Sequence, residues 1–305
     1  MVAMPSIVAG IEMEGTGCKV AISDSNGRFI EQDSLQIITT TAENTLRQIH
    51  DWLAARKSYR PFRAIGIACF VPIDLDKRSK TYGYITTTPK SGWQYVNIVG
   101  TFQDFNVPIA FETDVNAPAM TEASLRSDTS VAYITIGTGV GVGLVLGSQP
   151  VHGLMHPEGA HIRTESFPDD NYSGCCPFHG SCVEGMSNAK AVADRLNISS
   201  SLLNTISDDD HSICNIQAYY IAQLCVAIIC LTSVQRIVIG GGLAKKQSLF
   251  KYIRKYVQQM LNGYINVPAI IHNIDEYICP SILGNLIGIQ SALDLAQTVI
   301  NSEIS

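Results

Sequence analysis

The residues best suited to chemistry lie between positions 137 and 184, where three kinds of candidate site follow one another. A short glycine turn, Gly137-Thr138-Gly139, offers backbone amides that can surround a phosphate group. Metal-binding side chains and carboxylates follow it: Glu158, His161, Cys176, His179, Cys182 and Glu184. A phosphate-sized turn, a metal cluster and two carboxylates together indicate phosphoryl transfer from a nucleotide to a polyol.

The metal cluster is the most specific of the three. The spacing Cys176-x2-His179-x2-Cys182 places three ligands in one tight loop, and His161 lies upstream. Two thiolates and two imidazoles suit tetrahedral zinc, and a closed four-ligand shell is structural rather than catalytic. The adjacent Cys175 could replace Cys176, although the spacing favours the latter. The alternative is a surface loop without a metal. A bound zinc would hold the loop that presents the two glutamates.

Glycine turns occur at three places. Residues 10–17 and 137–143 each lie between expected strands, which fits neither a Walker loop nor a Rossmann fingerprint. Such a turn can still bind phosphate through its amides, and the alternative is a ligand-free hairpin. Gly240-Gly241-Gly242 follows a strand and precedes an expected helix starting at Leu243. Adenine or ribose could lie against this backbone, and a simple helix N-cap turn is the alternative.

Asp114 is the candidate general base. It follows the apolar strand 109–112 and precedes a helix. A carboxylate there can accept the proton of a hydroxyl that attacks a γ-phosphate. The alternative is that Asp114 is only the N-cap of that helix.

The composition is typical of a globular protein with more than one domain. The chain has 305 residues, of which 46% are apolar and 16% charged, and a net charge of −6. Two globular domains are therefore expected, and a general nucleic-acid or acidic-membrane surface is not. Nine cysteines without a visible signal peptide indicate reduced thiols in the cytosol. The longest apolar run, residues 224–231, is too short to span a membrane.

The predicted strands and helices that position the motifs follow the same order in the two halves of the chain. Strands are predicted at residues 7–11, 18–23, 64–70 and 109–112, and again at 132–136, 143–146 and 236–239. Helices are predicted at 41–55, 216–234, 249–261 and 286–299. A strand–glycine turn–strand unit followed by helices thus recurs, which indicates a distant internal duplication. Residues 199–212, with Asp208, Asp209 and Asp210, are expected to be a solvated loop.

The motifs together resemble those of the ROK sugar kinases, and within them the zinc-containing fructokinases. The likeness covers nearly the whole chain. Its specific strings are Thr88-Pro89-Lys90-x-Gly92-Trp93, Thr113-Asp114-Val115-Asn116, His156-Pro157-Glu158 with His161, Cys176-Pro177-Phe178-His179-Gly180-x-Cys182-x-Glu184-Gly185, and Leu283-Gly284-Asn285.

The resemblance implies an α/β fold with two RNase-H-like domains of the actin/hexokinase (ASKHA) type and a cleft between them. The N-terminal domain would span residues 1–117, with the C-terminal helix of 286–305 packing back on it. Residues 118–285 would form the C-terminal domain with its zinc-bound loop. The implied protein is a cytoplasmic homodimer that binds neither nucleic acid nor membrane.

The implied reaction is phosphorylation of fructose to fructose 6-phosphate by ATP with Mg²⁺. The resemblance assigns the general base to Asp114 and sugar binding to Glu158, Glu184, His161, Thr88 and Lys90. It assigns structural zinc to His161, Cys176, His179 and Cys182. It assigns ATP to Gly15, Thr16, Gly137, Thr138, Gly139, Ala189, Gly240, Gly241, Gly242, Leu243 and Ala244.

The first phosphate turn departs from the family pattern Glu-Ala-Gly-Gly-Thr-Lys. Here Glu14 replaces a glycine and Gly17 replaces the lysine. Glu14 puts negative charge where phosphate oxygens should lie. This charge would weaken nucleotide binding unless Mg²⁺ screens it. Two alternatives therefore stand beside fructokinase: a mannose or glucose kinase of the same family, and a sugar-binding pseudokinase. A repressor of the family would need a helix-turn-helix before the first strand, and none is seen here.

Overall fold

The computed structural model describes residues 6–205 and 211–302, and the chain forms two compact units. The first contains Met1–Thr121, His152–His156 and Leu286–Ser305, and the second contains Glu122–Val151 and Pro157–Asn285. The anticipated division at 117/118 thus lies four residues before the break at 121/122. The short segment His152–His156 was not anticipated in the first unit. It is held there because the His152 ring lies 2.7 Å from the Glu112 carboxylate and His156 Nε2 accepts the Ile73 N–H.

The sheet of the first unit has the order β3-β2-β1-β4-β5. Its strands are β1 (Ala9–Met13), β2 (Gly17–Ile22), β3 (Ser34–Ile38), β4 (Ile65–Cys69) and β5 (Ile109–Thr113). β1, β4 and β5 run parallel, whereas β2 and β3 pair antiparallel. Apolar residues predominate in β1, β2 and β4, which explains why these strands are mostly buried.

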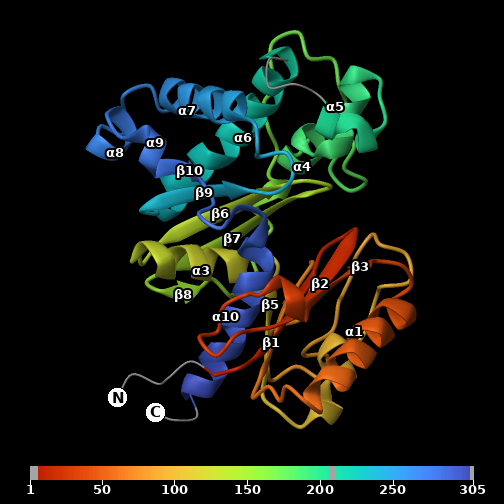
Figure 1. The fold of residues 1–305 in the computed structure, drawn as a ribbon. Coiled ribbons are helices and arrows are strands. Elements are labelled where there is room, and N and C mark those ends of the chain that lie inside the picture. Colours follow the sequence, from red (N-terminus) through yellow and green to blue (C-terminus); the bar gives the residue numbers. More distant parts are fainter. Residues whose placement is uncertain (1–5, 206–210, 303–305) are drawn as a thin grey trace. The chain divides into compact units, whose positions relative to one another are not determined.

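Helices cover this sheet. They are α1 (Ala42–Lys57), α2 (Ile98–Thr101), α3 (Asn116–Arg126), which runs past the division, and α10 (Ile287–Ser302), with 3₁₀ turns at Glu31–Asp33 and Gln103–Phe105. Thr41 caps α1 by accepting the Asn44 N–H. α10 lies against β1 and β4 in Figure 1, and its residues Leu293 and Ala292 belong to the buried core there.

The second unit repeats this topology. Its sheet has the order β10-β9-β6-β7-β8, so β6 matches β1 and β9 matches β4 in position. The strands are β6 (Val131–Ile136), β7 (Val140–Leu146), β8 (Gln149–Pro150), β9 (Arg236–Gly240) and β10 (Ile278–Pro280). β6, β9 and β10 are parallel, and β7 and β8 are antiparallel to their neighbours. The duplication predicted from the sequence is therefore visible in the strand order.

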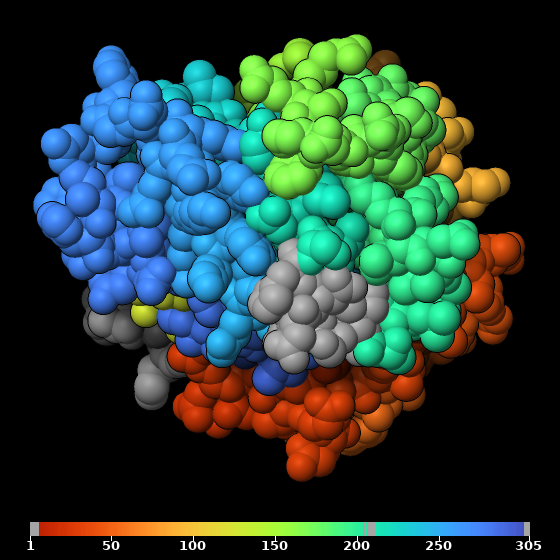
Figure 2. Space-filling model, turned by 90° about the horizontal axis from the view of Figure 1, so that it is seen from above, coloured from red at the N-terminus to blue at the C-terminus, as the bar shows by residue number. Residues whose placement is uncertain are grey.

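The helices of the second unit are α4 (Val183–Ser187), α5 (Ala189–Leu196), α6 (His211–Thr232), α7 (Gln247–Leu261), α8 (Pro268–Ile271) and α9 (Ile274–Tyr277), with 3₁₀ turns at Gly159–His161, Ser200–Thr205 and Gly284–Leu286. Figure 2 shows the face of this unit on which α7 (blue) and residues 160–200 (green) are exposed. In the described part of the chain, α6 is the one helix long and apolar enough to cross a membrane, and it is mostly buried in the core beside α7.

The start of α7 differs from the expectation drawn from the sequence. The helix expected to start at Leu243 starts at Gln247, so that expectation was wrong. Residues 243–246 form a turn instead, because the Leu243 N–H is bonded to Ile136 O and the Ala244 N–H to Gly241 O. The loop at Asp208, Asp209 and Asp210 lies outside the described residues.

Candidate functional site

In the first unit, the candidate residues gather at the carboxyl ends of the parallel strands. The residue 14–17 turn follows β1, and Asp114 follows β5. The Asp114 N–H donates to Cys69 O at 2.9 Å, and the Phe70 N–H donates to Met13 O at 2.9 Å. These bonds continue the ladder β1-β4-β5 by one residue. Ligands of open parallel sheets bind at this edge, because the strand ends and loops meet there.

The cap of α3 is supplied by the neighbour of Asp114. Thr113 Oγ1 accepts the Asn116 N–H at 2.8 Å, and Glu112 Oε1 accepts the Asn116 side-chain amide at 3.1 Å. The Thr113 hydroxyl therefore caps an N–H group in the first turn of α3. Asp114 is close enough to Glu12 to contribute to its raised pKa.

The first glycine turn is acidic. The pKa of Glu12 is raised to about 8, mainly by burial and further by the charges of Glu14 and Asp114, while Lys19 opposes the rise. Sequence reasoning did not include Glu12 in the site, although its position at the end of β1 could have indicated it. A divalent cation or another positive group near this turn would relieve the repulsion among the three carboxylates.

The loop that carries Thr88 and Lys90 reaches this turn. Thr88 is 3% exposed, and its hydroxyl accepts the Lys90 N–H at 3.3 Å. Lys90 Nζ donates to Gly15 O at 2.6 Å. The structure therefore brings together the predicted sugar residues of this loop and the predicted nucleotide residue Gly15.

In the second unit, the turn between β6 and β7 meets the start of α5. The Ala189 N–H donates to Gly137 O at 2.8 Å, and Gly137 N–H donates to Gly139 O at 2.9 Å. Glu184 Oε2 accepts the Val140 N–H at 3.2 Å. A Cβ at position 139 would lie 2.8 Å from Glu184 Oε2, so a larger residue there would displace this carboxylate. The structure thus places a predicted sugar carboxylate directly on the predicted phosphate turn.

Residues 240–244 follow β9 and lie beside this turn. A Cβ on Gly137 would be 4.0 Å from Gly242 N. Gly241 has φ +93° and lies so close to Ile136 that a Cβ would be 2.5 Å from its carbonyl oxygen, so only glycine fits. The two predicted nucleotide segments of this unit are therefore adjacent.

A cavity of about 1090 Å³ opens next to Gly240, Gly241 and Ala244. Its other walls come from α7 and the segments around Asp275 and Ser281. Four cationic side chains line it: Lys245, Lys251, Arg254 and Lys255. Sequence reasoning missed them, although their spacing along α7 places three of them near one face of a helix.

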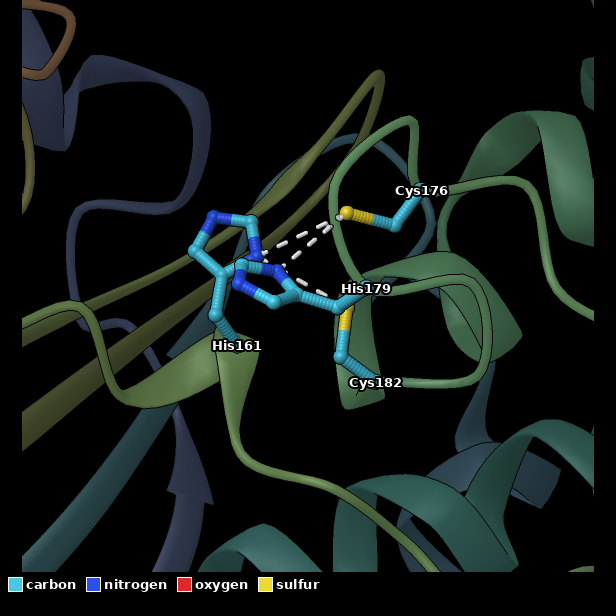
Figure 3. A group of neighbouring side chains, drawn as sticks. All are labelled: His161, Cys176, His179 and Cys182. Carbon is cyan, nitrogen blue, oxygen red and sulfur yellow. Dashed lines mark hydrogen bonds between the residues drawn. The ribbon is translucent and has the colours of Figure 1, made fainter.

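The four predicted metal ligands converge on one point in the second unit (Figure 3). Cys176 Sγ lies 3.8 Å from His161 Nδ1 and 3.6 Å from His179 Nδ1, and Cys182 Sγ lies 3.6 Å from His161 Nδ1. In tetrahedral zinc, Zn–S and Zn–N bonds of ordinary length separate sulfur from nitrogen by about 3.6 Å. The donor set and its spacing therefore fit a tetrahedral zinc ion.

Local structure explains how the loop brings these atoms together. The Gly180 N–H donates to Cys176 O at 2.9 Å, which closes a tight turn around His179. Gly180 has φ +60°, in the left-handed region. Cys175 points elsewhere, because its thiol donates to Asn188 Oδ1 at 3.3 Å. Of the two adjacent cysteines, Cys176 is the one in the cluster.

The cluster also adjoins both predicted sugar carboxylates. His161 Nε2 lies 3.7 Å from Glu158 Oε2, and Cys182 is the N-cap of α4, whose first turn contains Glu184. Burial and the neighbouring Glu184 raise the pKa of Glu158 to about 7. A metal bound through His161 Nδ1 would fix the orientation of the ring that faces Glu158.

Comparison with known proteins shows the family. The model described as "ROK family" matches residues 8–299 of this chain, which therefore belongs to the ROK family. The fructokinase of Pediococcus pentosaceus is 35% identical over 300 residues, 97% of this chain and 99% of that protein. The fructokinase of Lactococcus lactis subsp. cremoris is 36% identical over 270 residues, 88% of this chain and 89% of that protein.

Solved structures show the same fold. A ROK family glucokinase from Streptomyces griseus, solved with glucose and AMPPNP, has a TM-score of 0.75 at 21% identity, covering 96% of this chain and all of that one. A ROK hexokinase from Thermus thermophilus has a TM-score of 0.73 at 19% identity, covering 97% of this chain and 99% of that one. The predicted fold class and the predicted family are both confirmed.

Proposed function

We propose that this chain is an ATP-dependent fructokinase that converts fructose to fructose 6-phosphate. Relatives that are named fructokinase align with nearly its whole length at about one-third identity. The observation in the structure that carries the proposal is the bond between Glu184 and the amide of Val140. It joins a carboxylate suited to sugar hydroxyls to a turn suited to phosphate, as a sugar kinase requires.

Asp114 is the proposed general base. In this mechanism its carboxylate takes the proton of the primary hydroxyl while that oxygen bonds to the γ-phosphorus and the bond from phosphorus to ADP breaks. The proposed sugar contacts are Glu158, Glu184, His161, Thr88 and Lys90. Their role is to hold the hydroxyl in line with the phosphorus, because phosphoryl transfer depends mainly on positioning and charge stabilisation.

The proposed donor site comprises Gly15 and Thr16 in the first unit and a larger set in the second. That set is Gly137, Thr138, Gly139, Ala189, Gly240, Gly241, Gly242, Leu243 and Ala244. The start of α5 at Ala189 supports a phosphate at the Gly137 turn, because the amino end of a helix favours negative charge. Mg²⁺ bound with ATP would neutralise phosphate charge near the acidic first turn.

Zinc is the proposed occupant of His161, Cys176, His179 and Cys182. Four protein ligands leave no open position, so its role is structural. It would stabilise the loop from which Glu158 and Glu184 extend. The chemistry of transfer remains with the carboxylates and the donor site.

The test is release of ADP by purified, zinc-loaded protein with MgATP and, in parallel, fructose, mannose, glucose or no sugar. Turnover above about 1 s⁻¹ that requires fructose is expected, which is within the usual range for kinases. Turnover with mannose or glucose but not with fructose would support the same mechanism with a different hexose as the substrate. No turnover with any hexose from folded protein would overturn the proposal.

A pseudokinase is the second candidate, because Glu14 adds a carboxylate beside Glu12 at the first turn. It predicts hexose binding without turnover, and a large gain in rate when Glu14→Gly and Gly17→Lys are combined. A working fructokinase predicts little change from the same pair.

We further propose that the chain is a cytoplasmic homodimer, as the family resemblance implies. Light scattering of the purified protein should give twice the mass of the chain. A monomeric mass over the working concentration range would contradict the dimer. Fractionation of cells that produce the protein should place it with cytosolic markers.

A further inference from the structure

The first turn lacks a cation of its own. Glu12 and Glu14 flank it, and Lys19, the nearest lysine in the sequence, lies 3.8 Å from Glu31 and over the ring of Phe29. A donor phosphate at this turn would therefore face two carboxylates, and the one nearby lysine of β2, Lys19, is shared with Glu31 and Glu12. A cation from elsewhere in the chain would favour binding of a polyanion there, in addition to any Mg²⁺ that the polyanion brings with it.

Lys90 reaches the turn from a loop far away in the sequence. Its Nζ donates to Gly15 O, and it lies 4.9 Å from the ring centre of Phe70 and 4.8 Å from that of Trp93. Trp93 is fully buried, and its indole N–H is bonded to Thr40 O. Two aromatic faces thus hold the ammonium group at the turn before any ligand arrives.

The same turn has unused hydrogen-bond donors. Within residues 6–205 and 211–302, no acceptor is found for the backbone N–H groups of Gly15 and Thr16, and both residues are exposed. An ammonium group has three donors, so Lys90 can keep its bond to Gly15 O and offer two more. Two free amides beside a fixed ammonium make a site for an anionic oxygen.

We propose that the Lys90 ammonium binds the phosphate chain of the donor nucleotide at the residue 14–17 turn. This inference rests on the proposed kinase function and moves Lys90 from the sugar contacts to the donor site. Burial lowers the pKa of Lys90, with the thiols of Cys18 and Cys69 opposing, so the free site holds this cation at some cost that a bound phosphate would offset. Thr88 stays with the sugar.

The test compares Lys90→Met with Lys77→Met. Methionine keeps most of the side-chain length without the charge, and Lys77 is an exposed lysine of the same unit outside the site. The dissociation constant of MgATP is measured by titration calorimetry without sugar. Lys90→Met should weaken it about ten- to hundredfold, the usual worth of a charge-assisted hydrogen bond. Lys77→Met should change it by less than about twofold.

Kinetics separate the donor role from a sugar role. Lys90→Met should raise KM for ATP and leave KM for fructose within about twofold. Lys90→Arg, which keeps a charge suited to phosphate, should retain most of the affinity. If Lys90→Met folds poorly, Lys90→Gln carries the same expectation, because its amide can still donate to Gly15 O.

Unchanged MgATP affinity in Lys90→Met, or an increase confined to KM for fructose, would overturn the inference. A wrong role for Lys90 can be distinguished from a wrong kinase function. A wild-type protein that phosphorylates no hexose would refute the kinase proposal. The MgATP dissociation constants of wild type, Lys90→Met and Lys77→Met would still decide the role of Lys90.

Discussion

The turn after β1 and the turn after β6 occupy the same place in two sheets of the same strand order, yet they differ in charge. The second has no charged residue among Gly137, Thr138 and Gly139, the start of α5 adjoins it, and the one carboxylate placed beside it, that of Glu184, is bonded to the Val140 N–H. The first carries two carboxylates and has Lys90 at its tip. The duplicated topology therefore repeats the position of a proposed phosphate turn but not the charged groups around it.

If both turns bind phosphate as proposed, they would do so in two ways. In the second unit, helix α5 directs its amino end toward Gly137, and backbone dipoles supply the potential. In the first unit, an aromatic pair holds a side-chain cation in place. The second arrangement would depend on backbone groups, whereas the first would depend on one charged side chain.

The largest expected effect concerns a residue that only the first unit has. Asp114 follows β5, and Ser281 stands at the matching position after β10. Asp114→Asn should lower kcat about 10²–10⁴-fold, because general-base catalysis contributes that much. Steady-state kinetics measures it, with Asp51→Asn on α1 as a control of equal charge change. A variant that keeps more than about a tenth of the wild-type rate would refute Asp114 as base.

The next effect concerns the four-ligand metal cluster of the second unit. Cys176→Ser should abolish the stoichiometric zinc, lower the melting temperature and raise KM for fructose, because the loop that presents Glu158 and Glu184 loses its anchor. Cys175→Ser is the matched control and should keep zinc, since Cys175 is bonded to Asn188. Metal analysis of both variants checks this. Full activity of metal-free protein would contradict the structural role.

A smaller effect is expected when the first turn is made more like the second. Glu14→Gln should lower KM for ATP by roughly fivefold, because one exposed charge near a phosphate is worth about 1 kcal/mol. Glu43→Gln on α1 removes the same charge from the same unit and should have little effect. An unchanged or higher KM for ATP in Glu14→Gln would show that Glu14 does not repel the donor.

The smallest effect is a pH dependence of stability. The pKa of Glu12 is raised from 4.5 to about 8, so between these values the folded protein holds a proton that the unfolded chain has released. The free energy of unfolding therefore falls as pH rises across this window, by at most about 1.4 kcal/mol per pH unit. Glu12→Gln should flatten this slope.

Denaturant unfolding of wild type and Glu12→Gln at about pH 5.5 and about pH 8.5, without divalent cations, measures the difference between their slopes. Because Glu12 is partly exposed, the difference between the slopes should be smaller than about 1.4 kcal/mol per pH unit. Identical slopes for the two proteins would mean that Glu12 is ionised in the folded state at neutral pH.

The sequence predicts most of the fold because the strands are apolar runs bounded by turn residues. Residues 132–136 and 236–239 were predicted within a residue or two of β6 and β9. β10 was not predicted, because three residues are too few for any periodicity to show. The helix start at 243 was wrong because tertiary hydrogen bonds to Ile136 override the local preference.

The candidate site was predictable where several ligands lie close together in sequence. Cys176, His179 and Cys182 share one loop, so their spacing alone indicated the cluster. The position of Lys90 at the first turn could not be predicted, because seventy-five residues separate it from Gly15 and the contact depends on Trp93. The raised pKa of Glu12 likewise depends on burial that no local pattern reveals.

The most direct test of the central claim is ³¹P NMR of the products after wild-type, zinc-loaded protein is incubated with equimolar MgATP and fructose. The account predicts loss of the γ-phosphate signal, appearance of ADP and one new sugar-phosphate signal that matches fructose 6-phosphate. Asp114→Asn should leave the spectrum unchanged over the same time. Intact ATP with the wild type, or inorganic phosphate without sugar phosphate, would contradict the account.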